Sequence, residues 1–249
     1  MKKKKVPYNK TMADYEIIPP AAATAQSNGD FPGNLPAPPF RMAIYGHSAS
    51  GKGVLIANII GSKRFPYRSV YRRNIFIFSD TISLGDPSFS EVDLAEYHYI
   101  KGYDEVVLKR IWDENDAIIA KHGKSKAPHV LIVLDDTVTS LSNNPKSLLR
   151  RLFFQGRHSK ISTIVTSQAY TALPRSVRTN ADTAVFFETN RKQLSIIAEE
   201  QSVEADVFYA MMRAATEEAY SFLVIMYKKP IPQRYQLRFS NKFFEIPRD

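Results

Sequence analysis

Residues 42–52 read Met-Ala-Ile-Tyr-Gly-His-Ser-Ala-Ser-Gly-Lys, a short apolar run followed by a loop with a glycine at each end and then a lysine. The two glycines and the lysine have the spacing of a Walker A phosphate-binding loop. The motif needs a strand before it and a helix after it, and the sequence predicts both, the helix over 52–61. Glycines permit positive φ and close approach of the backbone, so that N–H groups and the helix N-terminus surround the phosphates. This stretch therefore predicts a nucleoside triphosphate site.

Lys52 is the charged group of this loop, and we expect it to face the β and γ phosphates, where charge spreads in the transition state. The next position is normally Ser or Thr, whose hydroxyl holds magnesium, but here it is Gly53. Water, Ser48 or Ser50 are possible replacements for that hydroxyl, and slow turnover is a further alternative. The predicted cofactors are ATP and Mg²⁺, and the predicted nucleotide-binding residues are Gly46, His47, Ser48, Ala49, Ser50, Gly51, Lys52 and Gly53.

A second motif follows about 80 residues later, where the apolar run 130–134 ends in Asp135 and Asp136. A buried strand that ends in two carboxylates has the Walker B arrangement, on a strand that could lie beside the P-loop strand. We expect Asp135 to hold the magnesium through its water shell and Asp136 to orient or deprotonate the attacking water. Gln168, after the strand 163–167, is predicted to sense the γ phosphate or that water. The alternatives are a turn-capping aspartate and a surface amide.

Short apolar runs alternate with helix-length stretches from Phe40 onward, which predicts βαβ units and a mainly parallel sheet. The fold class is therefore α/β, with a mainly parallel central sheet flanked by helices. The predicted strands are 41–45, 74–78, 130–134, 163–166, 183–187 and 221–227, and the predicted helices are 52–61, 104–122, 145–155, 192–200 and 203–214.

The chain of 249 residues is 44% hydrophobic, which is enough for one substantial core. Residues 1–38 are rich in Pro, Ala and Lys, so they are predicted to form a basic arm rather than a domain. The ATPase domain is expected at 39–240 and a C-terminal tail at 241–249. No apolar run is long enough to span a bilayer, and the absence of cysteine excludes disulfides and thiolate zinc sites.

The formal net charge of +9 favours a polyanionic partner, although five of the lysines lie in the first ten residues. A solvated tail and a nucleic-acid contact both remain possible for these lysines.

The order of the motifs resembles the FtsK–HerA superfamily, and within it the DNA-packaging ATPases of poxviruses and related DNA viruses. The residues that carry the resemblance, over roughly 40–227, are the P-loop, Ser79-Asp80-Thr81, Asp135-Asp136, Gly156-Arg157-His158, Ser167-Gln168, Leu173-Pro174 and Arg178-Thr179-Asn180. The resemblance implies a RecA-like core and a homo-oligomeric ring of about five or six subunits, with ATP between subunits and duplex DNA in the centre. It also implies that Arg157 is the arginine finger of a neighbouring site, with Arg175 and Arg178 in reserve.

The function that this resemblance implies is an ATP-hydrolysing translocase of double-stranded DNA that packages a viral genome into a preformed capsid. A nucleotide-dependent assembly scaffold and a related cellular DNA-transfer ATPase are the alternatives. Expected partners are duplex DNA, other copies of the chain, and capsid or vertex proteins. We expect a soluble protein without membrane insertion, in the host cytoplasm or viral factory or associated with the virion. The residues available for phosphate contacts are Arg150, Arg151, Arg157, Lys160, Arg191, Lys192, Lys121, Lys124 and Lys126.

Overall fold

The computed structural model describes residues 31–81, 99–137 and 147–246. From Pro32 onward these residues belong to one compact unit, Pro32–Asp249. The division into an arm at 1–38, a domain and a tail stays a prediction, because most of the arm lies outside the described residues.

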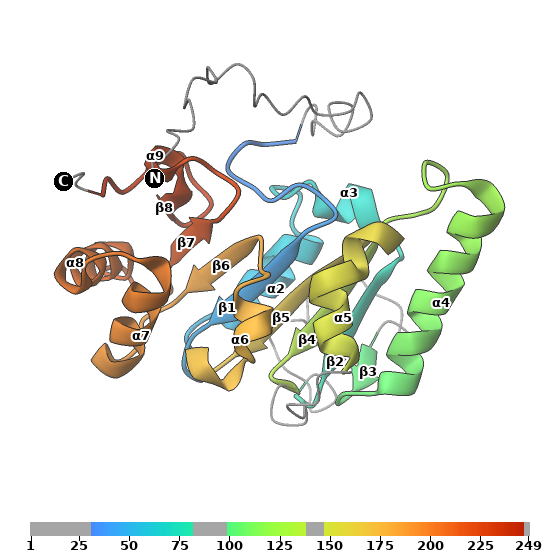
Figure 1. Ribbon diagram of the computed structural model, residues 1–249, viewed down its shortest axis with the longest axis horizontal. Helices are drawn as coiled ribbons and strands as arrows, with labels where there is room; N and C mark the ends of the chain where they lie inside the picture. The colour runs from blue at the N-terminus through green and yellow to red at the C-terminus, as the bar shows by residue number, and fades with distance from the viewer. Residues whose placement is uncertain (1–30, 82–98, 138–146, 247–249) are drawn as a thin grey trace, which may run out of the picture. The chain divides into compact units, whose positions relative to one another are not determined.

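The strands in these residues form one sheet in the order β3-β2-β4-β5-β1-β6-β7-β8 (Figure 1). The first six strands of this order, from β3 to β6, are parallel to their neighbours. Strand β7 is antiparallel to β6, and β8 is antiparallel to β7. The prediction of a mainly parallel α/β sheet is therefore confirmed. The strands are β1 (Arg41–Tyr45), β2 (Ile75–Ser79), β3 (Tyr99–Lys101), β4 (Val130–Asp135), β5 (Ile161–Ser167), β6 (Thr183–Phe186), β7 (Leu223–Met226) and β8 (Tyr235–Leu237).

The longer helices agree closely with the predicted ranges where those are described, whereas the short helices Tyr67–Tyr71, Arg175–Arg178 and Ile231–Arg234 were not predicted. They are α2 (Lys52–Gly61), α3 (Tyr67–Tyr71), α4 (Glu105–His122), α5 (Leu148–Gln155), α6 (Arg175–Arg178), α7 (Arg191–Gln201), α8 (Ala205–Ala215) and α9 (Ile231–Arg234), with 3-10 helices at Gly156–Ser159 and Tyr170–Ala172. The first residues of the helix predicted at 145–155 lie outside the described residues. None of the described helices combines the length and the apolar character that crossing a bilayer requires.

The strand that carries the two aspartates does not lie beside the P-loop strand, although the sequence allows that arrangement. Strand β5 pairs with β1 on one side and with β4 on the other. A parallel strand with an ordinary crossover can enter any free edge, and local sequence does not state which one. The end of β5 is therefore placed between the P-loop and the aspartates.

Successive residues of the central strands are packed against different layers, as in strands buried on both faces. Ile132 and Leu134 of β4 belong to the large core cluster that also contains residues of α4, α5, α7 and α8. Leu131 and Val133, which alternate with these residues along the strand, are fully buried but do not belong to that cluster. In Figure 1, α5 lies in front of the sheet and α2 behind it.

The sequence does not predict two of the strands, β3 and β8, and both are short edge strands. Lys101 of β3 is exposed, and Tyr99 and Ile100 are only half-buried, so β3 lacks a continuous apolar run. Strand β8 reads Tyr-Gln-Leu, which is also too short to show a period. Pairing with a neighbouring strand, rather than local pattern, decides these two elements.

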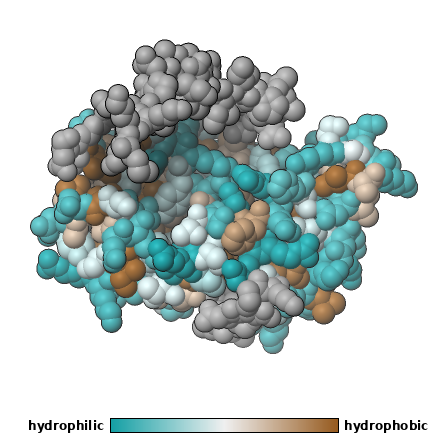
Figure 2. All heavy atoms as spheres, viewed as in Figure 1, coloured by the Kyte–Doolittle hydropathy of each residue, from teal (hydrophilic) through white to brown (hydrophobic). Residues whose placement is uncertain are grey.

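Large exposed hydrophobic side chains are few in the described part of the chain and come from different elements. On the face that Figure 2 shows, hydrophobic residues are scattered among hydrophilic ones outside the grey atoms. This distribution is ordinary for a protein surface and marks no broad apolar docking face. These side chains are Val54, Val106, Ile118, Phe154, Tyr220, Ile231 and Phe243.

Below pH 6.5 we expect the fold to lose stability through His129, which lies immediately before β4 and packs edge-on against Tyr71. Burial, with Lys160 and then Lys124 adding repulsion, lowers the pKa of His129 to about 4. Since the unfolded chain titrates at about 6.5, it binds more protons than the fold between these values, so stability falls as pH falls. The partly exposed ring limits this loss to about 2 kcal/mol.

Urea unfolding at pH 7 and pH 5 measures this effect, with His129→Leu expected to flatten the difference. His122→Leu, at an exposed position on α4, is the matched control and should behave as the wild type. Equal pH dependence in the wild type and His129→Leu would contradict the prediction.

Candidate functional site

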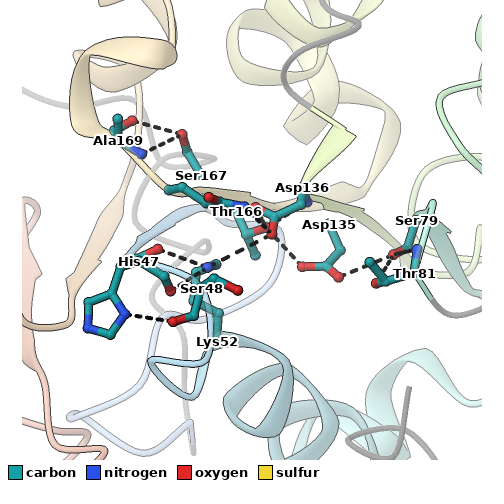
Figure 3. Close-up of polar contacts among 12 residues, drawn as sticks. His47, Ser48, Lys52, Ser79, Thr81, Asp135, Asp136, Thr166, Ser167 and Ala169 are labelled. Carbon is teal, nitrogen blue, oxygen red and sulfur yellow. Dashed lines mark hydrogen bonds and ion pairs between the residues drawn. The ribbon is translucent and has the colours of Figure 1, made fainter. Parts of the chain in front are cut away.

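The carboxyl ends of β1, β4 and β5 meet at one edge of the sheet, because parallel neighbours end on the same side. The P-loop leaves β1 there and enters α2, and the two aspartates leave β4 (Figure 3). This edge therefore brings together the two motifs that the sequence separates.

The two glycines of the P-loop have different physical roles. A Cβ on Gly46 would lie 2.5 Å from Ser50 Oγ and 2.8 Å from Phe187 Cβ, so the close approach of the loop to the end of β6 requires glycine there. Gly51 has φ of 106° and is the N-cap of α2, where no side chain caps the helix. Because the first N–H groups of a helix lack partners within it, this end can donate to a phosphate.

Lys52 is the first residue of α2, and its side chain is only 6% exposed. Its Nζ donates to Gly46 O at 2.8 Å and to His47 O at 3.0 Å, and lies 3.9 Å from Asp136 Oδ2. The ammonium group is thus held under the loop and directed toward the second carboxylate (Figure 3). This places a positive charge between the P-loop and the aspartates.

Asp135 is the buried member of the pair. Its Oδ1 accepts from Thr166 Oγ1 at 2.8 Å and its Oδ2 from Ser79 Oγ at 3.2 Å, and Ser79 Oγ lies 3.0 Å from Thr81 Oγ1. Burial raises the pKa of Asp135, and the hydrogen bond from Thr166 opposes that rise. The polar cluster at 79–81 is visible in the sequence at a strand end, whereas Thr166 carries no signal beyond that of a strand residue.

Asp136 turns away from the strand toward Lys52. Its φ is 48°, in the left-handed region that Asp tolerates better than most residues, and its N–H donates to Thr166 Oγ1 at 2.8 Å. Gln168 Nε2 donates to Asp136 Oδ2 at 3.3 Å, and the Asp136 side chain is 30% exposed. Thr166 therefore orients both aspartates, and the structure brings Lys52, Asp136 and Gln168 into one cluster.

The residues around Asp135 fit a magnesium ion bound together with a nucleotide. Mg²⁺ usually takes one or two carboxylates, and substrate phosphates and water complete its shell. In the ranges that the structure describes, no three His, Cys, Asp or Glu side chains gather as a protein-only metal site. The donor set at Asp135 is one carboxylate with the hydroxyls of Ser79 and Thr166, which suits a metal held mainly by phosphate.

The hydroxyls of Ser48 and Ser50 stay candidates for the one that Gly53 lacks. Ser48 is exposed, and Ser50 Oγ is buried with no hydrogen-bond partner among the described residues. The hydroxyls on the side of Asp135 are those of Ser79 and Thr166.

The three arginines named from the sequence lie in different environments. Arg157 is exposed in the 3-10 helix that precedes β5, at the opposite edge of the sheet from the P-loop. Arg175 is exposed at the start of α6. Arg178 pairs with Glu200, donates to Leu173 O at 2.6 Å and lies 4.6 Å from the Tyr170 ring centroid. The partners of Arg178 favour a structural role for it.

A mainly parallel sheet with a Walker A loop after β1 and an aspartate pair after β4 defines the class: this is a P-loop nucleoside triphosphatase. The chain belongs to the poxvirus A32 protein family, whose model matches residues 31–229. This match confirms the resemblance to the poxvirus-type ATPases that the motif order indicated.

Two solved structures support the same fold. The DNA-packaging ATPase B204 from Sulfolobus turreted icosahedral virus is 19% identical over 76% of this chain and 93% of that chain, with a TM-score of 0.51. The genome packaging NTPase B204 from Sulfolobus turreted icosahedral virus 2, in complex with sulfate, is 18% identical over 78% of this chain and 94% of that chain, with a TM-score of 0.50. A comparison with curated proteins finds no match.

Proposed function

We propose that this chain is an ATP-hydrolysing translocase that drives double-stranded DNA into a viral capsid. The observation that carries the proposal is the cluster of Lys52, Asp136 and Gln168, in which Asp136 Oδ2 lies 3.9 Å from Lys52 Nζ and 3.3 Å from Gln168 Nε2. A carboxylate beside the phosphate-binding lysine suits activation of water rather than binding alone. Membership of a poxvirus family supports a viral role over a cellular one.

The residues of the site divide the work of phosphate cleavage. Residues 46–53 surround the phosphates, and Lys52 offsets the negative charge that develops on them. Asp136 accepts a proton from, or orients, the attacking water, and Gln168 holds the Asp136 carboxylate and the water in position. Asp135 is the residue that would hold Mg²⁺, which supplies positive charge between phosphate oxygens when bound.

Duplex DNA should stimulate hydrolysis if the chain is a translocase. We expect steady-state ATP turnover of the assembled protein to rise with long duplex DNA, and to change little with single-stranded DNA, at low and moderate salt. Flat turnover in all three conditions would contradict the translocase.

Flat, very slow turnover together with nucleotide-dependent assembly would support the second candidate, a nucleotide-gated scaffold for capsid proteins. The observation that favours it is Gly53, which lacks the hydroxyl that normally holds magnesium.

The ring is part of the proposal, and Arg157 would act across its subunit interface. Arg157 lies at the edge of the sheet opposite its own P-loop, so it can reach phosphates only in another copy of the chain. We expect Arg157→Ala to bind nucleotide and to hydrolyse it about 10³-fold more slowly, the size of an arginine-finger effect.

Mixing Arg157→Ala with Lys52→Ala subunits tests this arrangement. In mixed rings some sites combine an intact P-loop with an intact Arg157, so activity should exceed that of either variant alone. An absence of any recovery at all mixing ratios would contradict a role between subunits.

A further inference from the structure

A basic groove lies beside α3, at the edge of the sheet where the parallel strands begin, opposite the nucleotide site. It is a cavity of about 610 Å³ whose lining includes Lys63, Arg68, Arg72 and Arg73, and none of the described residues that line it is a carboxylate. All four cationic residues are exposed. We call these four residues the basic groove.

The backbone that carries the groove is held by buried tyrosines. Tyr67 and Tyr71 of α3 are fully buried, with Tyr67 Oη donating to Pro36 O at 2.8 Å and Tyr71 Oη donating to Ser162 Oγ at 2.6 Å. The cations therefore project from a fixed short helix and its flanks. A fixed set of charges loses less conformational entropy on binding a polyanion than charges on a loose tail would.

None of the four cations forms an ion pair with a carboxylate in the described ranges. Arg68 makes one long hydrogen bond, from its guanidinium to Gly61 O at 3.4 Å. By contrast, two cations that the sequence analysis named for DNA pack on aromatic rings. Arg151 lies 4.9 Å from the Trp112 ring centroid, and Arg191 lies 5.1 Å from the Tyr209 ring centroid. The basic groove has its charge available to a partner.

Positive charge continues from the groove along the same edge of the sheet. Arg72 and Arg73 precede β2, Lys124 precedes β4 and Lys160 precedes β5, and parallel strands begin on one side. Leu131 N donates to Asn74 O at 2.9 Å and Val130 N to Lys160 O at 3.1 Å, so the three strand starts are adjacent. Burial lowers the pKa of Lys160, and repulsion from Lys124 lowers it further.

Asp182, an acidic residue at this edge, is already neutralised. Asp182 precedes β6, and it pairs with Arg41 at 2.6 Å and with Lys228 at 2.9 Å. The carboxylates of the nucleotide site lie at the far end of the strands. Strand β5 alone, Ile161–Ser167, separates the two edges by about 20 Å at about 3.3 Å per residue.

We propose that the basic groove contacts the phosphate backbone of duplex DNA. This inference rests on the proposed function and assigns its DNA surface. Lys and Arg contacts to phosphates hold DNA of any sequence, which is what a packaging motor requires.

The test replaces four cations and measures duplex affinity against salt. The groove variant carries Lys63→Gln, Arg68→Gln, Arg72→Gln and Arg73→Gln. A matched variant loses the same charge at four exposed positions on β3, α4 and α8: Lys101→Gln, Lys109→Gln, Arg110→Gln and Arg213→Gln. The probe is a 30-base-pair duplex of mixed sequence, and ATP hydrolysis without DNA reports that each variant keeps its nucleotide site.

We expect the groove variant to bind the duplex at least about 100-fold more weakly at low salt, and its salt slope to fall by about 3 to 4, near 0.9 for each phosphate contact. The matched variant should stay within a few-fold of the wild type. Equal weakening in both variants, or none in the groove variant, would overturn the assignment while leaving the translocase intact. A wild-type chain that binds no duplex at low salt would overturn the proposed function and this inference together.

Discussion

Replacing Lys52 with alanine should reduce ATP turnover at least about 10³-fold and weaken nucleotide binding. Removal of a single preorganised donor to developing charge costs about 10²–10³-fold, and Lys52 supplies a full positive charge from a buried position. Its loss also leaves Gly46 O and His47 O without the ammonium that they accept from, so the loop itself should loosen. The measurement is steady-state hydrolysis together with binding of a fluorescent ATP analogue.

Lys192→Ala is the control, because Lys192 is an exposed lysine on α7 and lies outside the cluster. It should keep wild-type turnover. Thermal unfolding of both variants separates loss of chemistry from loss of fold. Turnover by a well-folded Lys52→Ala protein at the wild-type rate would rule out a nucleotide site at this edge of the sheet.

Asp136→Asn is expected to give the opposite pattern, with nucleotide binding retained and hydrolysis lowered about 10²–10⁴-fold. Asparagine keeps the shape of the side chain and tolerates the φ of 48°, so the turn after β4 should persist. The amide carries no negative charge, and it is a far weaker proton acceptor than the carboxylate. Binding by equilibrium titration and cleavage in a single turnover measure the two steps separately.

Asp113→Asn provides the matched control, since Asp113 is exposed on α4 and pairs only with Lys109 among the described residues. It removes the same charge and should leave both steps unchanged. Full turnover by Asp136→Asn would mean that another group activates the water. The proposed role of Gln168, which is to hold the Asp136 carboxylate in position, would then be wrong as well.

Much of the fold was predictable because its signals are local. Strand 41–45 and helix 52–61 have in the structure the bounds that the sequence predicts, since an apolar run and a glycine loop mark both ends. Strand β4 carries a continuous apolar run because it is buried on both faces. The edge strand β8 and the antiparallel pairing of β7 gave no such signal, because they depend on a partner strand.

The candidate site was predictable in its parts. Glycine, lysine and aspartate at motif spacing indicated Lys52, Asp135 and Asp136, and Gln168 followed from its place at a strand end. The roles of these residues stay predictions, as does that of Arg157. The part that sequence reasoning missed is Thr166, which lies in a buried strand with other Ser and Thr residues; its contact with Asp135 follows only once β4 and β5 are known to be neighbours.

By itself, the sequence determined that this chain is a P-loop nucleoside triphosphatase with a mainly parallel sheet. The reason is that the P-loop motif and the apolar runs of buried strands are patterns of neighbouring residues. Only the tertiary structure decided that β5 lies between β1 and β4, so that Thr166 and Gln168 hydrogen-bond to the aspartates. Lys63, Arg68, Arg72 and Arg73 are already close in the sequence, and only the tertiary structure decided that they lie at the ends of the strands away from the nucleotide. The physical reason is that strand order, and the place of each segment relative to the nucleotide site, depend on chain crossovers, which no local pattern specifies.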